Sequence, residues 1–489
     1  MEAYSLFDMN VGEMVGSSTV YLVIITALLC IVNSIVKKTP LPPGPWNFPV
    51  VGSLPWLSIN SPHKTLYNMA KTYGNAFYLK FGSIPTLVLN EYQTIHDALV
   101  DKSEDFSGRP DLFSFEYASE GKSMSFTGCN RRFWKLHRRL AEKSLKTVME
   151  STLNLASEEA RNLAEMFTDN TLDPREQVLW SMAKVKYTLC YGNYKKNLDH
   201  FHKMINAVLK VLELHNTGNF LNFIPLARTI FKKRERELKE TCDKMMDMTK
   251  ISEEKHLAEY NRDKIEDAMD ALIKIGIDEG RSPLERDRIL HTVQDFIGAG
   301  LDITYISINW CLQYMAKYPN FQKLVQDEID QVLEGRPVTP LDQPSMPKTM
   351  SFIYEVLRHA CVVPFALPHS TVRDTTLQGY RIPKDTFVLV NLFSMTRDIK
   401  VFPEPEVFNP NRFIDNGNLN ADVLNRFIPC GIGRRRCVGE KLGKTELFLY
   451  VVNILQKLNV NQVSEINSTP IFGLVQKPKP FQLNFASRK

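Results

Sequence analysis

The chain has 489 residues, of which 44% are apolar and 24% charged, with a formal net charge of +5. This composition is typical of a globular protein, and the length suits two or three domains or one large enzyme domain. The small positive charge argues against a nucleic-acid-binding protein. The eight cysteines include no C-x-x-C pair and no His/Cys cluster with zinc spacing. The sequence therefore indicates a reduced, cytosol-facing chain and not a disulfide scaffold.

An apolar segment near the amino terminus predicts a membrane anchor. Residues 20–36 read VYLVIITALLCIVNSIV, and at about 1.5 Å per residue they span roughly 26 Å, close to the thin hydrocarbon layer of the endoplasmic reticulum. Acidic residues precede the segment and Lys37 and Lys38 follow it. The positive-inside rule then predicts a lumenal amino terminus (residues 1–19), a single transmembrane helix (20–36) and a cytosolic body. A buried core helix is the alternative.

A basic and proline-rich stretch, residues 37–45, follows the apolar segment. It contains four prolines between positions 40 and 45, which cannot continue a helix. We expect a stiff, extended hinge between the anchor and the body.

The body is predicted to be mainly helical with a minor β region. Residues 75–90 alternate like two strands around a Gly-Ser-Ile-Pro turn. Helical spacing marks residues 130–150, 153–168, 198–214, 227–262, a very long segment from 282 to 318, and 438–457. Residues 360–395 have strand-like spacing and 402–413 predict a loop. No linker composition follows residue 45, so residues 46–489 are expected to form one catalytic domain.

The most informative short stretch is FIPCGIGRRRCVGE, residues 427–440, which encloses Cys437 in glycines and arginines. A nucleophilic cysteine would need a histidine and an orienting partner. A cysteine thiolate can instead bind haem iron, where it donates electron density and favours cleavage of an O–O bond. Glycines would let the backbone approach a flat macrocycle, Arg435 could pair with a propionate, and the following helix would point its positive end at the sulfur. A dinucleotide-binding loop is disfavoured because Arg436 stands where its third glycine belongs.

With these neighbours, GIGRRRCVG resembles the haem-binding loop of the cytochrome P-450 superfamily. Further motifs of that family occur in the expected order: FWKLHRRL with Trp134 and Arg138, GAGLDI at 298–303, YEVLRH with Glu355 and Arg358, LPHSTVRD with His369, and FNPNRF with Arg412. The resemblance covers essentially the whole chain. Within the superfamily, the sequence is most similar to the animal microsomal group that contains the aryl-hydrocarbon hydroxylases and the steroid 17- and 21-hydroxylases.

The resemblance implies a cytochrome P-450 fold, preceded here by the transmembrane helix, and a role for each matching residue. Haem b would be bound by Cys437 as the axial thiolate, with Trp134, Arg138, His369 and Arg435 near its propionates. Glu355, Arg358 and Arg412 would form a buried ion network, and Asp302 and Thr304 are the candidates for proton delivery. The expected walls of an apolar substrate pocket are Phe126, Asp295, Ala299, Val363, Leu367, Phe472 and Leu474.

The implied activity is a monooxygenase of the endoplasmic reticulum membrane that hydroxylates or epoxidises small lipophilic compounds, planar aromatic or steroid-like. It would use O2 and electrons from NADPH through a cytochrome reductase, with cytochrome b5 as an optional second donor. Basic residues cluster at 131–146 and 434–444, and we expect them to form the surface that an acidic reductase binds. A solvated basic surface without a partner, or one that touches the membrane, is the alternative.

Three positions depart from the family pattern. Ile303 stands where the family has a threonine directly after the acid, and Thr304 lies one residue further, about 100° around a helix. We expect weaker coupling of electrons to product unless an ordered water or a helix bulge compensates. Cys430 replaces the phenylalanine seven residues before the ligand, and Asn411 replaces the glutamate before Arg412. The missing threonine keeps two alternatives open: a haem-thiolate isomerase or dehydratase that does not use O2, and a weakly active haem protein that binds a lipophile.

Overall fold

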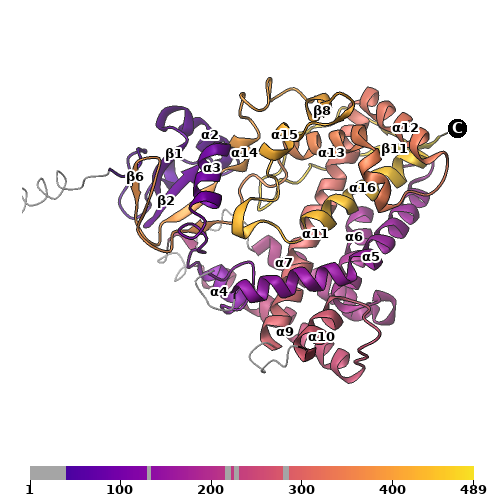
Figure 1. Ribbon diagram of the computed structural model, residues 1–489, viewed down its shortest axis with the longest axis horizontal. Coiled ribbons are helices and arrows are strands. Elements are labelled where there is room, and N and C mark those ends of the chain that lie inside the picture. The colour runs from indigo at the N-terminus through magenta and orange to yellow at the C-terminus, as the bar shows by residue number, and fades with distance from the viewer. Residues whose placement is uncertain (1–39, 129–133, 215–221, 225–230, 279–285, 489) are drawn as a thin grey trace, which may run out of the picture.

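The computed structural model describes residues 40–128, 134–214, 222–224, 231–278 and 286–488 (Figure 1). Helices dominate this part of the chain, as predicted. They are α2 (Pro62–Tyr73), α3 (Tyr92–His96), α4 (Phe113–Ser119), α5 (Trp134–Phe167), α6 (Arg175–Tyr191), α7 (Leu198–Leu214), α9 (Lys232–Ala258), α10 (Ala268–Asp278), α11 (Arg286–Lys317), α12 (Pro319–Leu333), α13 (Pro347–Ala360), α14 (Leu392–Met395), α15 (Ala421–Arg426) and α16 (Glu440–Lys457).

Two small sheets and two hairpins form the minor β region. The first sheet has the order β1 (Ala76–Phe81), β2 (Ile84–Leu89), β7 (Phe387–Val390) and β4 (His369–Ser370); the second has the order β10 (Leu458–Gln462), β11 (Leu483–Ser487) and β3 (Asn170–Leu172). The hairpins are β5 (Thr375–Leu377) with β6 (Tyr380–Ile382), and β8 (Ile414–Asp415) with β9 (Asn418–Leu419). The predicted strand pair at 75–90 is confirmed as antiparallel β1 and β2. The β1–β2 end of the molecule lies away from the helical layer of α5, α6, α11 and α16 (Figure 1).

Several helix predictions are confirmed, one pair needs correction, and α2, α6, α10, α12 and α13 were not among the predicted helices. The predicted helix at 198–214 is α7, and the long segment before Pro319 contains α11. The two helices expected at 130–150 and 153–168 are one continuous helix, α5, because residues 150–153 contain neither proline nor glycine to break it. Helix α6 was missed, since it is buried on most of its circumference and therefore shows no single apolar stripe.

The main hydrophobic core lies around α5, α6, α11, α13 and α16. Helix α11 passes through it and buries 22 of its 32 residues, including Trp310, Cys311 and Leu312. A second, smaller core joins the β1–β2–β7 sheet to residues 112 and 365. The sequence segments that carry the family motifs therefore meet around one central helix.

The described part of the proline-rich hinge, residues 40–45, lies against the body. The carbonyls of Pro40 and Pro43 accept hydrogen bonds from the backbone N–H groups of Arg381 and Tyr78, at 2.9 and 2.8 Å. A Cβ on Gly44 would overlap the Tyr78 carbonyl oxygen. These residues thus run along the sheet instead of forming a free spacer.

The predicted anchor at 20–36 and the lumenal segment 1–19 lie outside the described residues. Among the described residues, no helix combines the length and apolar character needed to cross a bilayer.

Candidate functional site

Cys437 occupies the turn between the loop 427–436 and α16. Its backbone N–H donates to the Cys430 carbonyl at 3.0 Å, and its side chain is exposed although it lies beside elements of the core. A hydrogen bond from the Cys430 thiol, opposed by burial and helped by the Gly439 N–H and by Arg138, lowers the pKa of Cys437 to about 7. A substantial fraction of the sulfur is therefore thiolate near neutral pH, the form that binds metals.

The glycines of this loop have different reasons to be glycine. Gly433 has a φ of 75°, and a Cβ there would lie 2.0 Å from the Leu99 carbonyl oxygen. Its role is to allow the loop to pack on the chain segment that follows α3. A Cβ on Gly439 would instead meet the Cys437 Sγ at 3.9 Å. From the sequence alone, the close approach of the haem macrocycle would explain all these glycines. For Gly433 the structure gives a different reason, which is the close approach of the Leu99 carbonyl.

One stripe of α11 is exposed although the helix is otherwise buried. Ala299 and Ile303, four residues apart on the same face, are both exposed, and 40% of the Ile303 surface is accessible. Thr304 is only 7% exposed and lies on another face. The helix is regular across this stretch, so the bulge that would turn Thr304 toward Ala299 is not present.

Asp302 points to a charged neighbour outside that stripe. One of its carboxylate oxygens lies 3.3 Å from the Nζ of Lys477. Burial raises the pKa of Asp302, while Lys477 and Tyr305 lower it. Lys477 and Tyr305 also line a surface pocket of about 350 Å³. Lys477 was not among the predicted residues and carries no motif; only the tertiary structure brings it to Asp302.

Three of the predicted propionate partners come from distant segments and meet near one another. The Arg435 guanidinium lies 4.2 Å from the centre of the Trp134 ring. Both side chains donate to the Met124 carbonyl, each at 3.0 Å. His369 is buried in β4, and its Nδ1 bonds to the Phe106 carbonyl at 2.9 Å; burial, together with the charges of Arg109 and Arg435, holds its pKa well below the usual value. His369 is therefore a neutral hydrogen-bonding group in this structure, and its place near a haem propionate stays a prediction.

Arg138 and Arg109 extend this group of cations. Arg138 donates to the Arg436 carbonyl at 2.8 Å and pairs with Glu142 at 2.9 Å, so its guanidinium faces the ligand loop. Arg109, which the sequence reasoning missed, donates to the carbonyls of Ser125 and Pro368 at 2.8 and 2.9 Å. Its signal in the sequence was the SGRP stretch at 107–110, which no motif assigned to a role.

These residues fit a haem group. The donor set combines a thiol of lowered pKa with guanidinium and indole N–H groups that suit carboxylates. Helix α11 adds an apolar stripe that the packing of the core leaves uncovered. Cys437 would bind the iron, and Trp134 and Arg435 would bind the propionates.

The predicted substrate residues lie on four separate segments. Phe126, Val363, Leu367, Phe472 and Leu474 are half-buried, and Asp295 is buried. Phe472 stacks on His63 with ring centres 5.4 Å apart, and Phe126 packs on Phe115 at 4.7 Å. Their assembly into one pocket wall stays a prediction.

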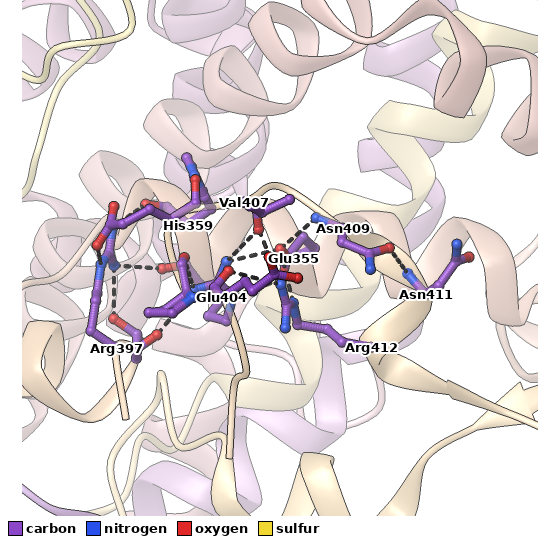
Figure 2. A network of polar contacts seen from close by, with 12 residues as sticks. Glu355, His359, Arg397, Glu404, Val407, Asn409, Asn411 and Arg412 are labelled. Atoms are coloured by element: carbon purple, nitrogen blue, oxygen red, sulfur yellow. Dashed lines mark hydrogen bonds and ion pairs between the residues drawn. The ribbon is translucent and has the colours of Figure 1, made fainter. Parts of the chain in front are cut away.

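Figure 2 shows the network built on Glu355. Arg358 donates to both carboxylate oxygens of Glu355 at 2.7 and 2.8 Å, and the Nε of Arg412 donates to Oε1 alone at 3.2 Å. Arg358 also donates to the carbonyls of Thr396 and Pro405, at 3.0 and 2.8 Å. The Asn411 side chain is exposed, and only its backbone N–H contacts Asn409. The network therefore ties α13 to residues 396–412.

A basic pocket lies on the outer side of the ligand loop. It has a volume of about 390 Å³ and is lined by Val100, Ser103, Arg138, Glu142, Gly433, Arg434 and Arg436. The predicted basic residues 131–132 lie outside the described residues. Among the other basic side chains of residues 131–146, Arg138 lines this pocket together with Arg434 and Arg436 of the second basic cluster.

Comparison with known proteins agrees with this geometry. The family model for cytochrome P450 matches residues 42–485. The chain is 33% identical to cytochrome P450 1A5 of Gallus gallus over 465 residues (90% of this chain and 88% of the relative), and 32% identical to cytochrome P450 1A2 of Oryctolagus cuniculus over 494 residues (96% and 95%). It is 31% identical to human cytochrome P450 1A2 over 502 residues (96% and 97%). The chain therefore belongs to the cytochrome P450 family of haem-thiolate monooxygenases.

Proposed function

We propose that this protein is a membrane-bound monooxygenase of the endoplasmic reticulum that hydroxylates or epoxidises planar aromatic or steroid-like lipophiles. Its electrons would come from NADPH through a cytochrome reductase, with cytochrome b5 as an optional donor. When bound, haem supplies the activation of O2. The residues of the chain hold the group, exclude water from it and direct substrate and protons to it.

The observation that carries this proposal is the Cys437 thiol. It combines a pKa of about 7 with an exposed sulfur, and α16 begins three residues later. The N–H of Gly439 and the guanidinium of Arg138 both favour the thiolate. A structural cysteine in a protein core has the opposite properties, as Cys311 illustrates: it is fully buried, and burial raises its pKa.

Two features support the source of electrons and the location. The pocket formed by Arg138, Arg434 and Arg436 lies next to the ligand loop and suits an acidic protein surface. The apolar residues 20–36, followed by two lysines, suit a single anchor with the body in the cytosol. Binding to an acidic reductase should weaken as ionic strength rises.

A second candidate function rests on Ile303. Its apolar side chain occupies the exposed stripe of α11 beside Ala299, while the Thr304 hydroxyl is buried on another face. A side chain that cannot hold or pass a proton suits a rearrangement of an already oxygenated substrate, in which no external electrons are consumed. A haem-thiolate isomerase or dehydratase is therefore the alternative.

The test combines a spectrum with turnover. The reduced protein with carbon monoxide should show the long-wavelength band typical of thiolate ligation; Cys437→Ser should lose it and the matched control Cys430→Ser should keep it. The protein is then mixed with reductase, NADPH and a panel of planar aromatics and steroids. Product that requires both NADPH and O2 supports the monooxygenase, and turnover without NADPH supports the alternative. Retention of the band in Cys437→Ser would refute both.

A further inference from the structure

The carboxylate of Asp295 on α11 is buried, and within the described part of the chain its hydrogen-bond donors come from one short segment. The Ser123 hydroxyl lies 2.8 and 2.9 Å from its two oxygens, and the backbone N–H groups of Met124 and Ser125 donate to Oδ2 at 2.9 and 3.2 Å. Among the described residues, no cation forms an ion pair with it. A buried carboxylate is costly unless hydrogen bonds compensate, and these donors supply that compensation.

The segment 123–127, which we name the strap, is held from the opposite side through its carbonyl groups. The Met124 carbonyl accepts from Trp134 and Arg435, the Ser125 carbonyl from Arg109 and the Thr127 carbonyl from Arg435. The N–H groups of the strap thus contact Asp295, and its carbonyls contact the predicted propionate partners. Fixed on both sides, the strap lies between α11 and the candidate haem site.

The Ser123 hydroxyl connects the carboxylate to Phe126. Its oxygen accepts hydrogen bonds from the N–H groups of Ser125 and Phe126, at 3.0 and 3.1 Å, while its proton goes to Asp295. The turn formed in this way fixes the backbone N–H of Phe126, whose ring packs on Phe115. Without the carboxylate, the Ser123 hydroxyl would lose the acceptor that orients it.

The position of Asp295 along α11 gives this contact a functional meaning. Residues 295, 299 and 303 are spaced by four and therefore share one stripe of the helix, the stripe on which Ala299 and Ile303 are exposed. Asp295 would be expected to face the substrate, yet the strap occupies its carboxylate. We infer that Asp295 is a positioning residue which, through Ser123, holds the Phe126 ring against the substrate side of α11 and so sets the affinity for flat ligands. This inference rests on the proposed function of the site.

Hydrogen exchange tests the contact without any ligand. In the holoprotein, Asp295→Asn should speed exchange of the amides of Met124, Ser125 and Phe126 by about tenfold or more, since one carboxylate oxygen is replaced by an NH2 group and the other by a neutral, weaker acceptor. Ser123→Ala should affect Ser125 and Phe126 in the same way. Asp327→Asn, an exposed aspartate on α12, is the matched control and should change none of them. Unchanged amides of α13 would show that the fold is intact, and unchanged strap amides in Asp295→Asn would overturn the inference.

A double-mutant cycle tests whether Asp295 acts through Phe126. Pyrene is the probe, and its Kd is measured on the holoprotein without NADPH or reductase. Asp295→Asn should weaken pyrene binding about fivefold in the parent and less than about twofold when Phe126→Ala is already present. Additive effects, no effect of Phe126→Ala, or no binding of pyrene by the parent would each overturn the inference. Because no turnover is measured, failure of the monooxygenase proposal and failure of this one are separate outcomes.

Discussion

Glu355 in its network and Asp302 on α11 are both buried carboxylates, but their oxygens are satisfied to different degrees. Both carboxylate oxygens of Glu355 accept hydrogen bonds from buried arginine side chains. Asp302 has one half-buried lysine at 3.3 Å, and the next residue is an isoleucine. The first region retains every family residue except the exposed Asn411, whereas the second has isoleucine at position 303, where the family pattern has threonine. Structure and chemistry are thus carried by separate regions, and one can change without the other.

Glu355→Ala should have the largest effect on stability. It leaves the guanidinium of Arg358 buried without its counter-ion, which costs about 3–5 kcal/mol in similar pairs. We expect a large loss of haem content and a lower midpoint of urea unfolding, with unfolding measured by circular dichroism. Glu404→Ala, an exposed glutamate in the segment 396–412 that the network contacts, is the control and should stay within about 0.5 kcal/mol of the parent. Equal midpoints for the two variants would contradict the structural role of the network.

Ile303→Thr should change the chemistry without changing the fold. A hydroxyl would then stand beside Ala299 on the exposed stripe, and we expect more product per NADPH and less released peroxide. General acid catalysis typically contributes roughly 10²–10⁴-fold to a rate, and this range is the upper limit for the gain in product formation. Ile303→Val has the same shape as threonine without the hydroxyl and is the matched control. A ratio of product to NADPH that is the same in all three proteins would show that another group, such as an ordered water, delivers the proton.

Lys477→Met should produce a smaller effect that depends on pH. Burial raises the pKa of Asp302 and the Lys477 charge lowers it, so removal of the charge moves the pKa further up. The carboxylate then becomes protonated at a higher pH than in the parent. If ionised Asp302 is the active form, the acid limb of product per NADPH against pH should move to higher pH. Lys479→Met, two residues away, should leave the profile in place. A profile that does not move in Lys477→Met would exclude this pair from proton delivery.

Asn411→Glu should have the smallest effect. The variant restores the family residue, but position 411 is exposed and its side chain makes no contact with Glu355 among the described residues. The urea midpoint should correspond to a change within about 0.5 kcal/mol. A larger gain would mean that the network extends to position 411.

The local patterns of the chain predicted much of the fold and the identity of the ligand. Regular apolar spacing located α7, α11 and the β1–β2 pair, because periodicity depends only on which side of an element is buried. The neighbours of Cys437 indicated a haem thiolate, because they alter the sulfur through short-range contacts. The division of α5 into two helices was wrong, since the pattern weakens along a helix even where nothing breaks it.

Residues brought together from distant segments could not be predicted in the same way. Lys477 reaches Asp302 across 175 positions in sequence, and Ser123 reaches Asp295 across 172. The sequence does not indicate the partner of either residue, because single lysines and serines occur on any protein surface. The neutral state of His369 is a further example, because the burial and the neighbouring arginines that lower its pKa arise only when β4 joins its sheet.

The sequence by itself determined the class of chemistry, because a cysteine, its arginines and its glycines lie within eleven residues and act on one another directly. Tertiary structure alone decided which of the candidate side chains are exposed and which are covered. It placed Ile303 on the exposed stripe of α11 and Thr304 off it, and it covered the Asp295 carboxylate with the strap. The physical reason is that exposure and hydrogen bonding of a side chain depend on what packs against it, and those neighbours come from other parts of the chain.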